Sequence, residues 1–162
     1  MAPCTRHLWL GNALERIQRI EEKKGRKRSL LVDGRGVPLC AIASGANVHD
    51  VKLLAATLEK IVVPRPRQEE KLCGDAGYKG KSALTVALSQ GYEPHIKQRK
   101  EEAQSKREGC QPRRWVVERT HSWFNRFRKI LVSFEKSEQS YLGLTYLAAA
   151  MICWRKTIFI YG

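Results

Sequence analysis

Residues 113–131 carry the clearest pattern of apolar and polar positions in this chain of 162 residues. At 100° per residue, the apolar positions fall on one face of a helix and the polar positions on the other. The apolar stripe consists of Val116, Thr120, Trp123, Phe127 and Ile130, and the polar face holds Arg114, Glu118, Asn125 and Lys129. The pattern predicts one continuous amphipathic helix, with a single carboxylate on its basic face.

Shorter patterns predict strands and helices earlier in the chain. β-type segments at 29–32 and 37–43 flank an Asp-Gly-Arg-Gly turn at 33–36, which is a strong hairpin signal. A helix capped by Asn47 is expected to run to about residue 60. Its apolar side would hold Val51, Leu54, Ala55 and Leu58. Short strands at 71–75 and 92–96 flank a helix at about 82–90, which Gly91 ends.

The remaining segments are a loop, a last helix and an N-terminal stretch. A polar loop is expected at 97–111, and a last helix at about 138–156 follows a break near Ser137. Residues 1–28 are poorly patterned, and only a short charged helix at 14–24 is expected there. The element order ββα-βα-βα-α predicts a mixed α/β fold with helices packed on a sheet.

Charge and cysteine content narrow the class of protein. The net charge of +14 and a pI near 9.9 favour a polyanionic partner, most simply nucleic acid, over a merely soluble basic protein. The five cysteines are scattered without a Cys-x-x-Cys pair, which argues against a zinc ribbon and is typical of reduced thiols in the cytosol. The longest apolar run, 141–154, is too short for a typical membrane span, and no signal peptide is expected.

Two carboxylates are the candidate metal ligands. Asp75 lies at the carboxyl end of a predicted strand, where open α/β sheets hold ligands. Glu118 lies near the start of the amphipathic helix, and two converging carboxylates can hold Mg²⁺ beside a phosphate. Simpler roles exist for both. Asp75 next to Gly77 suits a turn, and Glu118 can pair with Arg114 on a solvated face.

Cations and aromatic residues are interleaved along the same helix. The cations can neutralise several phosphates, whereas most of the aromatics lie on the apolar stripe and are expected to pack in the core. The cations are Arg113, Arg114, Arg119, Arg126, Arg128 and Lys129. His49, His95 and His121 have no metal-ligand spacing and are interpreted as structural or surface residues.

Six ordered blocks of the sequence resemble the DDE transposases of bacterial insertion sequences, of the insertion-sequence-five kind. The blocks are LLVDGRGVPL (30–39), GANVHD (45–50), GDAGY (74–78), EPHI (93–96), RRWVVERT (113–120) and ICWR (152–155). The resemblance implies a ribonuclease-H-like catalytic core over 27–157, N-terminally truncated and with C-terminal helices. It implies cutting and joining of transposon ends with Mg²⁺ or Mn²⁺. It also implies DNA as partner, a homo-oligomeric synaptic complex and a bacterial cytoplasmic, nucleoid-associated location.

The resemblance also assigns roles to particular residues. Asp75 matches the second catalytic Asp and Glu118 the catalytic Glu, both as metal ligands. DNA contacts would come from Arg114, Arg119, Arg126, Arg128 and Lys129. Of the family's Tyr-Arg-Glu-Lys signature, Gln111 stands at the Tyr and Asn125 at the Lys, whose charge Lys129 is expected to supply.

The first catalytic Asp of the family has no match in this chain. Asp33 lies in the hairpin turn itself, and no Asp precedes it. We hypothesise that residues 1–26 are frame-shifted. If a G precedes the first codon, the frame one nucleotide earlier begins Asp-Gly and permits a string that resembles the family's segment from its first Asp to the hairpin. The leading function is therefore a partial, inactive DDE transposase. Alternatives are a non-enzymatic DNA-binding regulator of the full transposase and a remnant without a stable fold.

Overall fold

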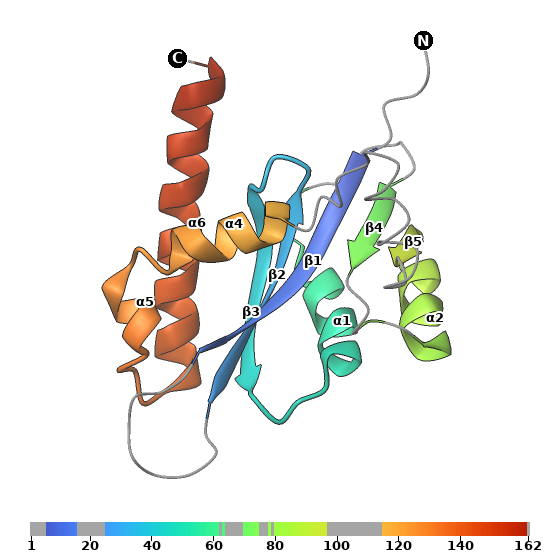
Figure 1. Ribbon diagram of the computed structural model, residues 1–162, viewed down its shortest axis with the longest axis horizontal. Helices are drawn as coiled ribbons and strands as arrows, with labels where there is room; N and C mark the ends of the chain where they lie inside the picture. Colours follow the sequence, from blue (N-terminus) through green and yellow to red (C-terminus); the bar gives the residue numbers. More distant parts are fainter. Residues whose placement is uncertain are drawn as a thin grey trace, which may run out of the picture.

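Five strands form one mixed sheet in the computed structural model, which describes residues 6–15, 25–61, 63, 70–74, 78, 80–96 and 115–161. The strands are β1 (Arg6–Glu15), β2 (Arg26–Asp33), β3 (Pro38–Gly45), β4 (Glu70–Gly74) and β5 (Tyr92–Ile96). They lie in the order β3-β2-β1-β4-β5 (Figure 1). β1 is antiparallel to β2 and parallel to β4, so the sheet changes direction at its central strand.

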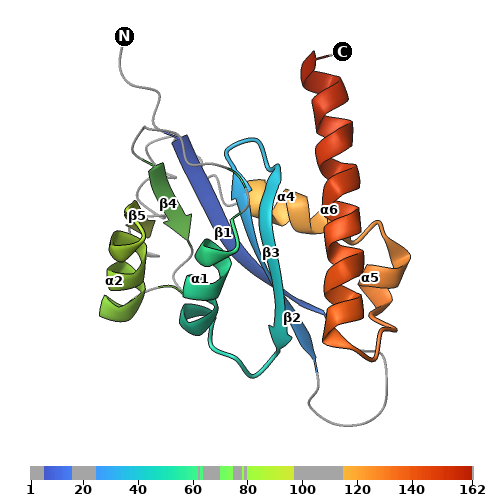
Figure 2. The ribbon, with the colours of Figure 1, turned by 180° about the vertical axis from the view of Figure 1, so that it is seen from behind.

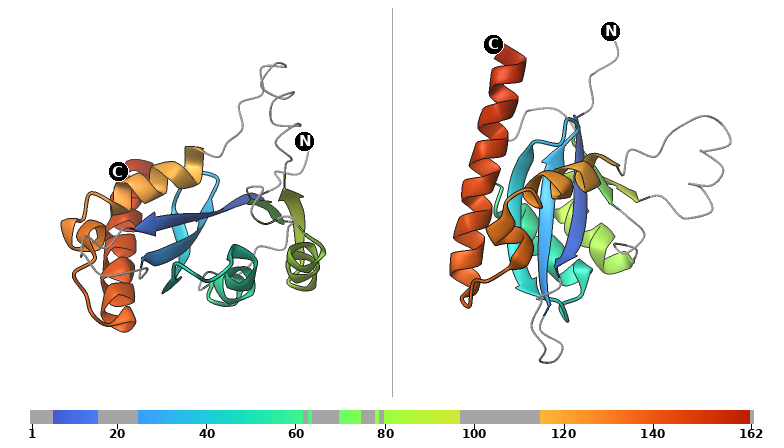
Figure 3. Two further views of the ribbon diagram at one scale, coloured as in Figure 1. Left: turned by 60° about the horizontal axis from the view of Figure 1, so that its bottom comes forward. Right: turned by 60° about the vertical axis from the view of Figure 1, so that its left-hand side comes forward.

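Helices cover both faces of this sheet. One face packs against α1 (Asp50–Glu59) and α2 (Lys81–Ser89). The other packs against α4 (Trp115–Phe124), α5 (Arg128–Val132) and α6 (Glu138–Tyr161), as Figures 2 and 3 show. Alternation along β2 divides the core: Leu31 joins the α1–α2 side, whereas Leu30 and Val32 join the α4–α6 side. The mixed α/β prediction is confirmed.

β1 is the main element that the sequence pattern missed. Residues 6–15 form β1, which is the first strand in the chain and the central strand of the sheet. The helix expected at 14–24 is therefore wrong for Leu14 and Glu15, which belong to this strand. Residues 16–24 lie outside the described residues. The strand is held by pairing to β2 and β4 and by Leu8 and Leu10, which are 1% and 3% exposed. Its stability therefore comes from tertiary context more than from a periodic pattern.

The helix predicted over 113–131 is two helices instead of one. α4 ends at Phe124, and α5 begins at Arg128 after a turn. Arg28 of β2, fully buried, reaches this turn: its Nη2 donates to Asn125 Oδ1 (3.2 Å), and its guanidinium lies 4.8 Å from the centre of the Phe124 ring. The buried cation thus contacts the last residue of α4 and the first residue of the turn that follows it.

The smaller expectations have mixed outcomes. α1 is capped by His49, whose Nδ1 accepts from the Val51 N–H at 3.4 Å, and not by Asn47. Its buried residues are Leu53, Leu54, Thr57 and Leu58, so the predicted apolar side is shifted by about one position. α2, β5 and the start of α6 match the prediction to within a residue. β4 ends at Gly74, and the predicted loop at 97–111 lies outside the described residues.

The turn between β2 and β3 confirms the hairpin and gives Asp33 a structural role. Its Oδ1 accepts hydrogen bonds from the backbone N–H groups of Arg35 (2.9 Å) and Val37 (2.8 Å). Gly36 has a φ of +84°, which side-chain-bearing residues rarely adopt. A carboxylate that satisfies two backbone donors within its own turn is a turn residue, as its sequence context also suggested.

Gly36→Ala should lower the free energy of unfolding by about 2 kcal/mol, because positive φ strains alanine and the new methyl group meets α4. The added Cβ would lie 2.9 Å from Thr120 Oγ1 and 3.1 Å from Arg119 Nη2. Urea denaturation measures the change. Gly143→Ala is the control, because Gly143 lies within α6 with nothing within 4 Å of an added Cβ and should gain stability. Equal stability of Gly36→Ala and the parent chain would contradict the close packing of α4 on the turn.

Candidate carboxylate site and basic surface

α4 is anchored on the β2–β3 turn, and this anchor sets the direction of Glu118. Thr120 Oγ1 donates to the Gly36 carbonyl at 2.8 Å, and Arg119 Nη2 donates to the Arg35 carbonyl at 2.6 Å. Val116 and Thr120, on the side of α4 that faces the sheet, are fully buried. Glu118 is exposed to solvent, where its carboxylate can meet a ligand.

The carboxyl end of β4 lies beside the central strand, β1. Trp9 of β1 pairs with Val32 of β2 and with Cys73 of β4, so these residues form one row across the sheet. α4 packs over β1 and β2 in the same region. Asp75 follows Gly74, the last residue of β4, but Asp75 itself lies outside the described residues. The distance between the two candidate carboxylates is therefore not defined.

β1 contributes no acid to this region. From Arg6 to Leu14 it contains neither Asp nor Glu, and its one acid, Glu15, is the last residue of the strand. Trp9, which packs against the core under α4 and α6, occupies the row level with the end of β4. Within the described ranges, no three His, Cys, Asp or Glu residues gather in a way that could hold a metal ion. In the row level with the end of β4, the central strand thus carries a large aromatic ring and no carboxylate.

The predicted DNA-contacting cations come from different elements and differ in exposure. Arg114 lies outside the described residues. Arg119 is half-buried, with its guanidinium 4.4 Å from the Trp115 ring centre, so it serves packing. Arg128 and Lys129 are exposed, but on α5. The expectation that Lys129 supplies a charge one turn beyond Asn125 on the same helix face is wrong, because α4 ends before both residues.

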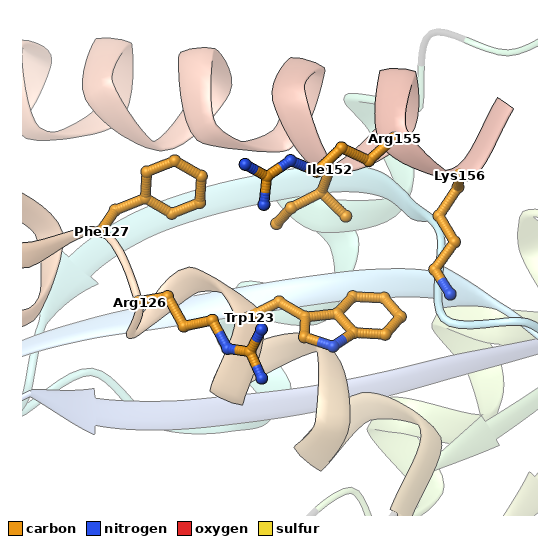
Figure 4. A pocket seen from close by; sticks show the side chains of 6 residues that line it. All are labelled: Trp123, Arg126, Phe127, Ile152, Arg155 and Lys156. Atoms are coloured by element: carbon orange, nitrogen blue, oxygen red, sulfur yellow. The ribbon is translucent and has the colours of Figure 1, made fainter. Parts of the chain in front are cut away.

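A pocket between α4 and α6 brings in two cations that the sequence reasoning missed. We call it the Trp123 pocket, and Figure 4 shows the side chains that line it. Its volume is about 360 Å³, and it is lined by Trp123, Arg126, Phe127, Ile152, Arg155 and Lys156. Arg155 and Lys156 belong to α6, which the sequence pattern identified only as a buried helix. The available signal was their spacing: they come three and four positions after Ile152, which places them one helical turn beyond this buried residue.

Neither Cys40 nor Cys153 is a candidate nucleophile. Burial raises the pKa of Cys40 to about 11, although the charge of Lys60 opposes the rise. Burial and, secondarily, the carboxylate of Asp33 raise the pKa of Cys153. Both thiols are therefore protonated near neutral pH and slow to react. None of the described helices is long and apolar enough to cross a membrane.

The sheet order and the carboxylate-bearing helix across the central strand define a ribonuclease-H-like core. The catalytic core domain of BIV integrase shares this fold, with a TM-score of 0.56 at 12% identity over 88% of this chain and 80% of that chain. Residues 17–153 match the family described as Transposase DDE domain, and the chain belongs to that family. A Burkholderia cepacia protein assigned as the transposase of insertion sequence element IS402 is 34% identical over 138 residues.

The family match leaves out the central strand, and the match to the Burkholderia protein covers only part of that relative. The alignment with the Burkholderia protein covers 82% of this chain and 64% of that relative, so the chain spans less than two thirds of the relative's length. The family match begins at residue 17, after the end of β1 at Glu15. Residues 6–15 therefore occupy the central strand of the fold without belonging to the matched part of the family.

Proposed function

We propose that this chain binds DNA through the basic surface of α4, α5 and α6 and does not cut DNA by itself. Membership of the transposase family and the net charge of +14 support DNA as the partner. The observation that carries the second part is β1, which supplies no carboxylate between Arg6 and Leu14 and has Trp9 level with the end of β4. The family's chemistry needs acids from the central strand as well as from β4 and α4.

Asp75 and Glu118 are the two carboxylates that we assign to this incomplete site. In an intact relative, bound Mg²⁺ or Mn²⁺ would activate the attacking oxygen and stabilise the leaving one. Asp75 follows β4 and Glu118 lies on α4, and among the described residues no three possible ligands gather to hold a metal ion. Tight metal binding is not expected, and we derive no cutting step for this chain.

A strand-cutting assay on the full chain tests the proposal. With a labelled duplex and excess Mg²⁺ or Mn²⁺, we expect no more cut product from the parent chain than from Asp75→Asn or Glu118→Gln. Both variants should still bind the duplex, with affinity within about threefold of the parent chain or slightly tighter, because each loses a negative charge near phosphates. Fluorescence anisotropy measures the binding, and gel separation of the strands measures the cutting.

The two parts of the proposal fail in different ways. Metal-dependent cutting by the parent chain that Asp75→Asn abolishes would refute catalytic incompleteness while leaving DNA binding intact. Failure of the folded parent chain to bind duplex or single-stranded DNA would refute the binding surface. A cooperative thermal melt, recorded for each variant, excludes loss of fold as the cause and also argues against a remnant without stable structure.

A regulatory role is the second candidate, and the absence of Asp and Glu between Arg6 and Leu14 of the central strand favours it. A chain that binds transposon ends without cutting them would compete with a relative that has all three carboxylates. Adding the parent chain to such a relative should lower its cutting rate in proportion to the ends occupied. The nucleotide sequence around the first codon separately tests the frame hypothesis. A base other than G before that codon would rule out an overlapping Asp.

A further inference from the structure

We propose that the Trp123 pocket holds one nucleotide of single-stranded DNA, with the base against Trp123 and the phosphate between the cations of α6 and the α4–α5 turn. This inference rests on the proposed DNA binding and names a subsite for it. The lining residues come from two elements that face each other, α4 with its following turn and α6 (Figure 4). The pocket volume of about 360 Å³ lies at the small end of the range for ligand sites, which suits one nucleotide unit and not a duplex.

The charges in the pocket favour a phosphate. Three of its six lining residues are cations, and none is an acid. Arg126 and Arg155 are exposed, and Lys156 is half-buried. Within the described part of the chain, the two ion pairs, Lys27–Asp50 and Lys71–Glu93, involve none of these three. Three cations that line one pocket, with no carboxylate among the lining residues, repel one another and are stabilised by a bound anion.

The aromatic wall favours a base next to that phosphate. Lys156 Nζ of α6 and the guanidinium carbon of Arg119 lie over the Trp123 ring, 4.3 Å and 5.0 Å from its centre, so a stacked base takes the place of one of these cations on the ring face. Trp123 and Phe127 are half-buried, so part of each ring is open to a ligand, and Ile152 is buried at the apolar base of the pocket. Aromatic rings beside backbone-binding cations are the usual means by which proteins hold unpaired bases.

The pocket is separate from the carboxylate site. Trp123 comes five positions after Glu118 on α4, which turns it about 140° around the helix axis. Glu118 points to solvent, whereas Trp123 points toward α6. Arg128 and Lys129, which are exposed on α5, follow Arg126 of the pocket by two and three positions and add to the basic surface. A strand that enters the pocket therefore meets further cations, which favours an oligonucleotide over a free mononucleotide.

The test compares two charge-matched double variants of the full chain. Arg126→Gln with Arg155→Gln removes two cations of the pocket, and Arg128→Gln with Lys129→Gln removes two outside it. We expect the pocket variant to bind a short oligothymidylate at least about tenfold more weakly than the control variant does. Both should bind duplex DNA with about the same affinity as each other. Anisotropy at fixed salt measures all four affinities.

An abasic oligonucleotide of the same length tests the stacked base. The parent chain should prefer oligothymidylate over the abasic strand by roughly tenfold, and Trp123→Leu should remove that preference while retaining charge-dependent binding. If Trp123→Leu does not fold, the pair of double variants still decides the question.

Several results would overturn the pocket assignment. Equal losses in both double variants, no preference for bases, or a free nucleotide competing as well as the strand would each do so. An RNA strand bound more tightly with the same pocket dependence would reject DNA as the occupant. Oligothymidylate binding without any pocket dependence would defeat this inference alone, whereas loss of all DNA binding by the folded parent chain would defeat the proposed function.

Discussion

Replacing Arg28 with alanine is expected to lower the free energy of unfolding by about 3–5 kcal/mol. Arg28 is fully buried on β2, and its guanidinium joins three elements. Nη1 donates to the Tyr141 hydroxyl of α6 at 3.4 Å, and Nη2 donates to Asn125 Oδ1 at the end of α4. The substitution leaves a cavity against the Phe124 ring and removes the donor to two acceptors.

Urea denaturation with matched variants separates the contributions. Arg26→Ala is the control, because Arg26 lies on the same strand, 5.2 Å from the Tyr141 ring centre, but is only half-buried. It should lose less than about 1 kcal/mol. Arg28→Met keeps most of the side-chain volume, so its loss reports the hydrogen bonds without a large cavity. A fully stable Arg28→Ala would contradict the view that this buried cation organises the break between α4 and α5.

The same arginine explains why the sequence pattern missed the helix break. The apolar stripe continues through Thr120, Trp123, Phe127 and Ile130 with helical spacing, and no Pro or Gly interrupts it. At the break Asn125 accepts a hydrogen bond from Arg28, which is almost a hundred positions away in sequence and contacts it only in the folded chain. Local periodicity contains no information about such a contact, so the pattern predicted the buried face correctly and the continuity wrongly.

Predictability elsewhere follows the range of the interactions. The hairpin was predictable because Asp33 and Gly36 specify the turn within a few residues. β1 was not predictable. Of the β1 side chains whose burial the structure describes, Leu8 and Leu10 are buried on the α1–α2 side, and pairing to β2 and β4 holds the strand. For the site, the sequence predicted an exposed Glu118 on a helix. It could not predict that Arg119 would be used in packing on the turn or that α6 would bring two cations to Trp123.

Duplex DNA affinity should fall by roughly 10²- to 10³-fold between about 50 and 200 mM salt, because each cation that neutralises a phosphate releases a counterion. The described surface offers five such cations: Arg126, Arg128, Lys129, Arg155 and Lys156. Five phosphate contacts give a slope of about −4.5 in a plot of log affinity against log salt. Anisotropy titrations at a series of salt concentrations measure this slope.

The slope of this plot also distinguishes cations that contact phosphates from the carboxylate of Glu118, which does not. Arg128→Gln with Lys129→Gln should reduce its magnitude by about two, because two phosphate contacts are lost. Glu118→Gln should leave the slope unchanged and shift affinity slightly upward at every salt concentration, since Glu118 is exposed on α4 and repels phosphate. A slope near zero, or one that the double substitution leaves unchanged, would place DNA binding outside the α4–α6 layer.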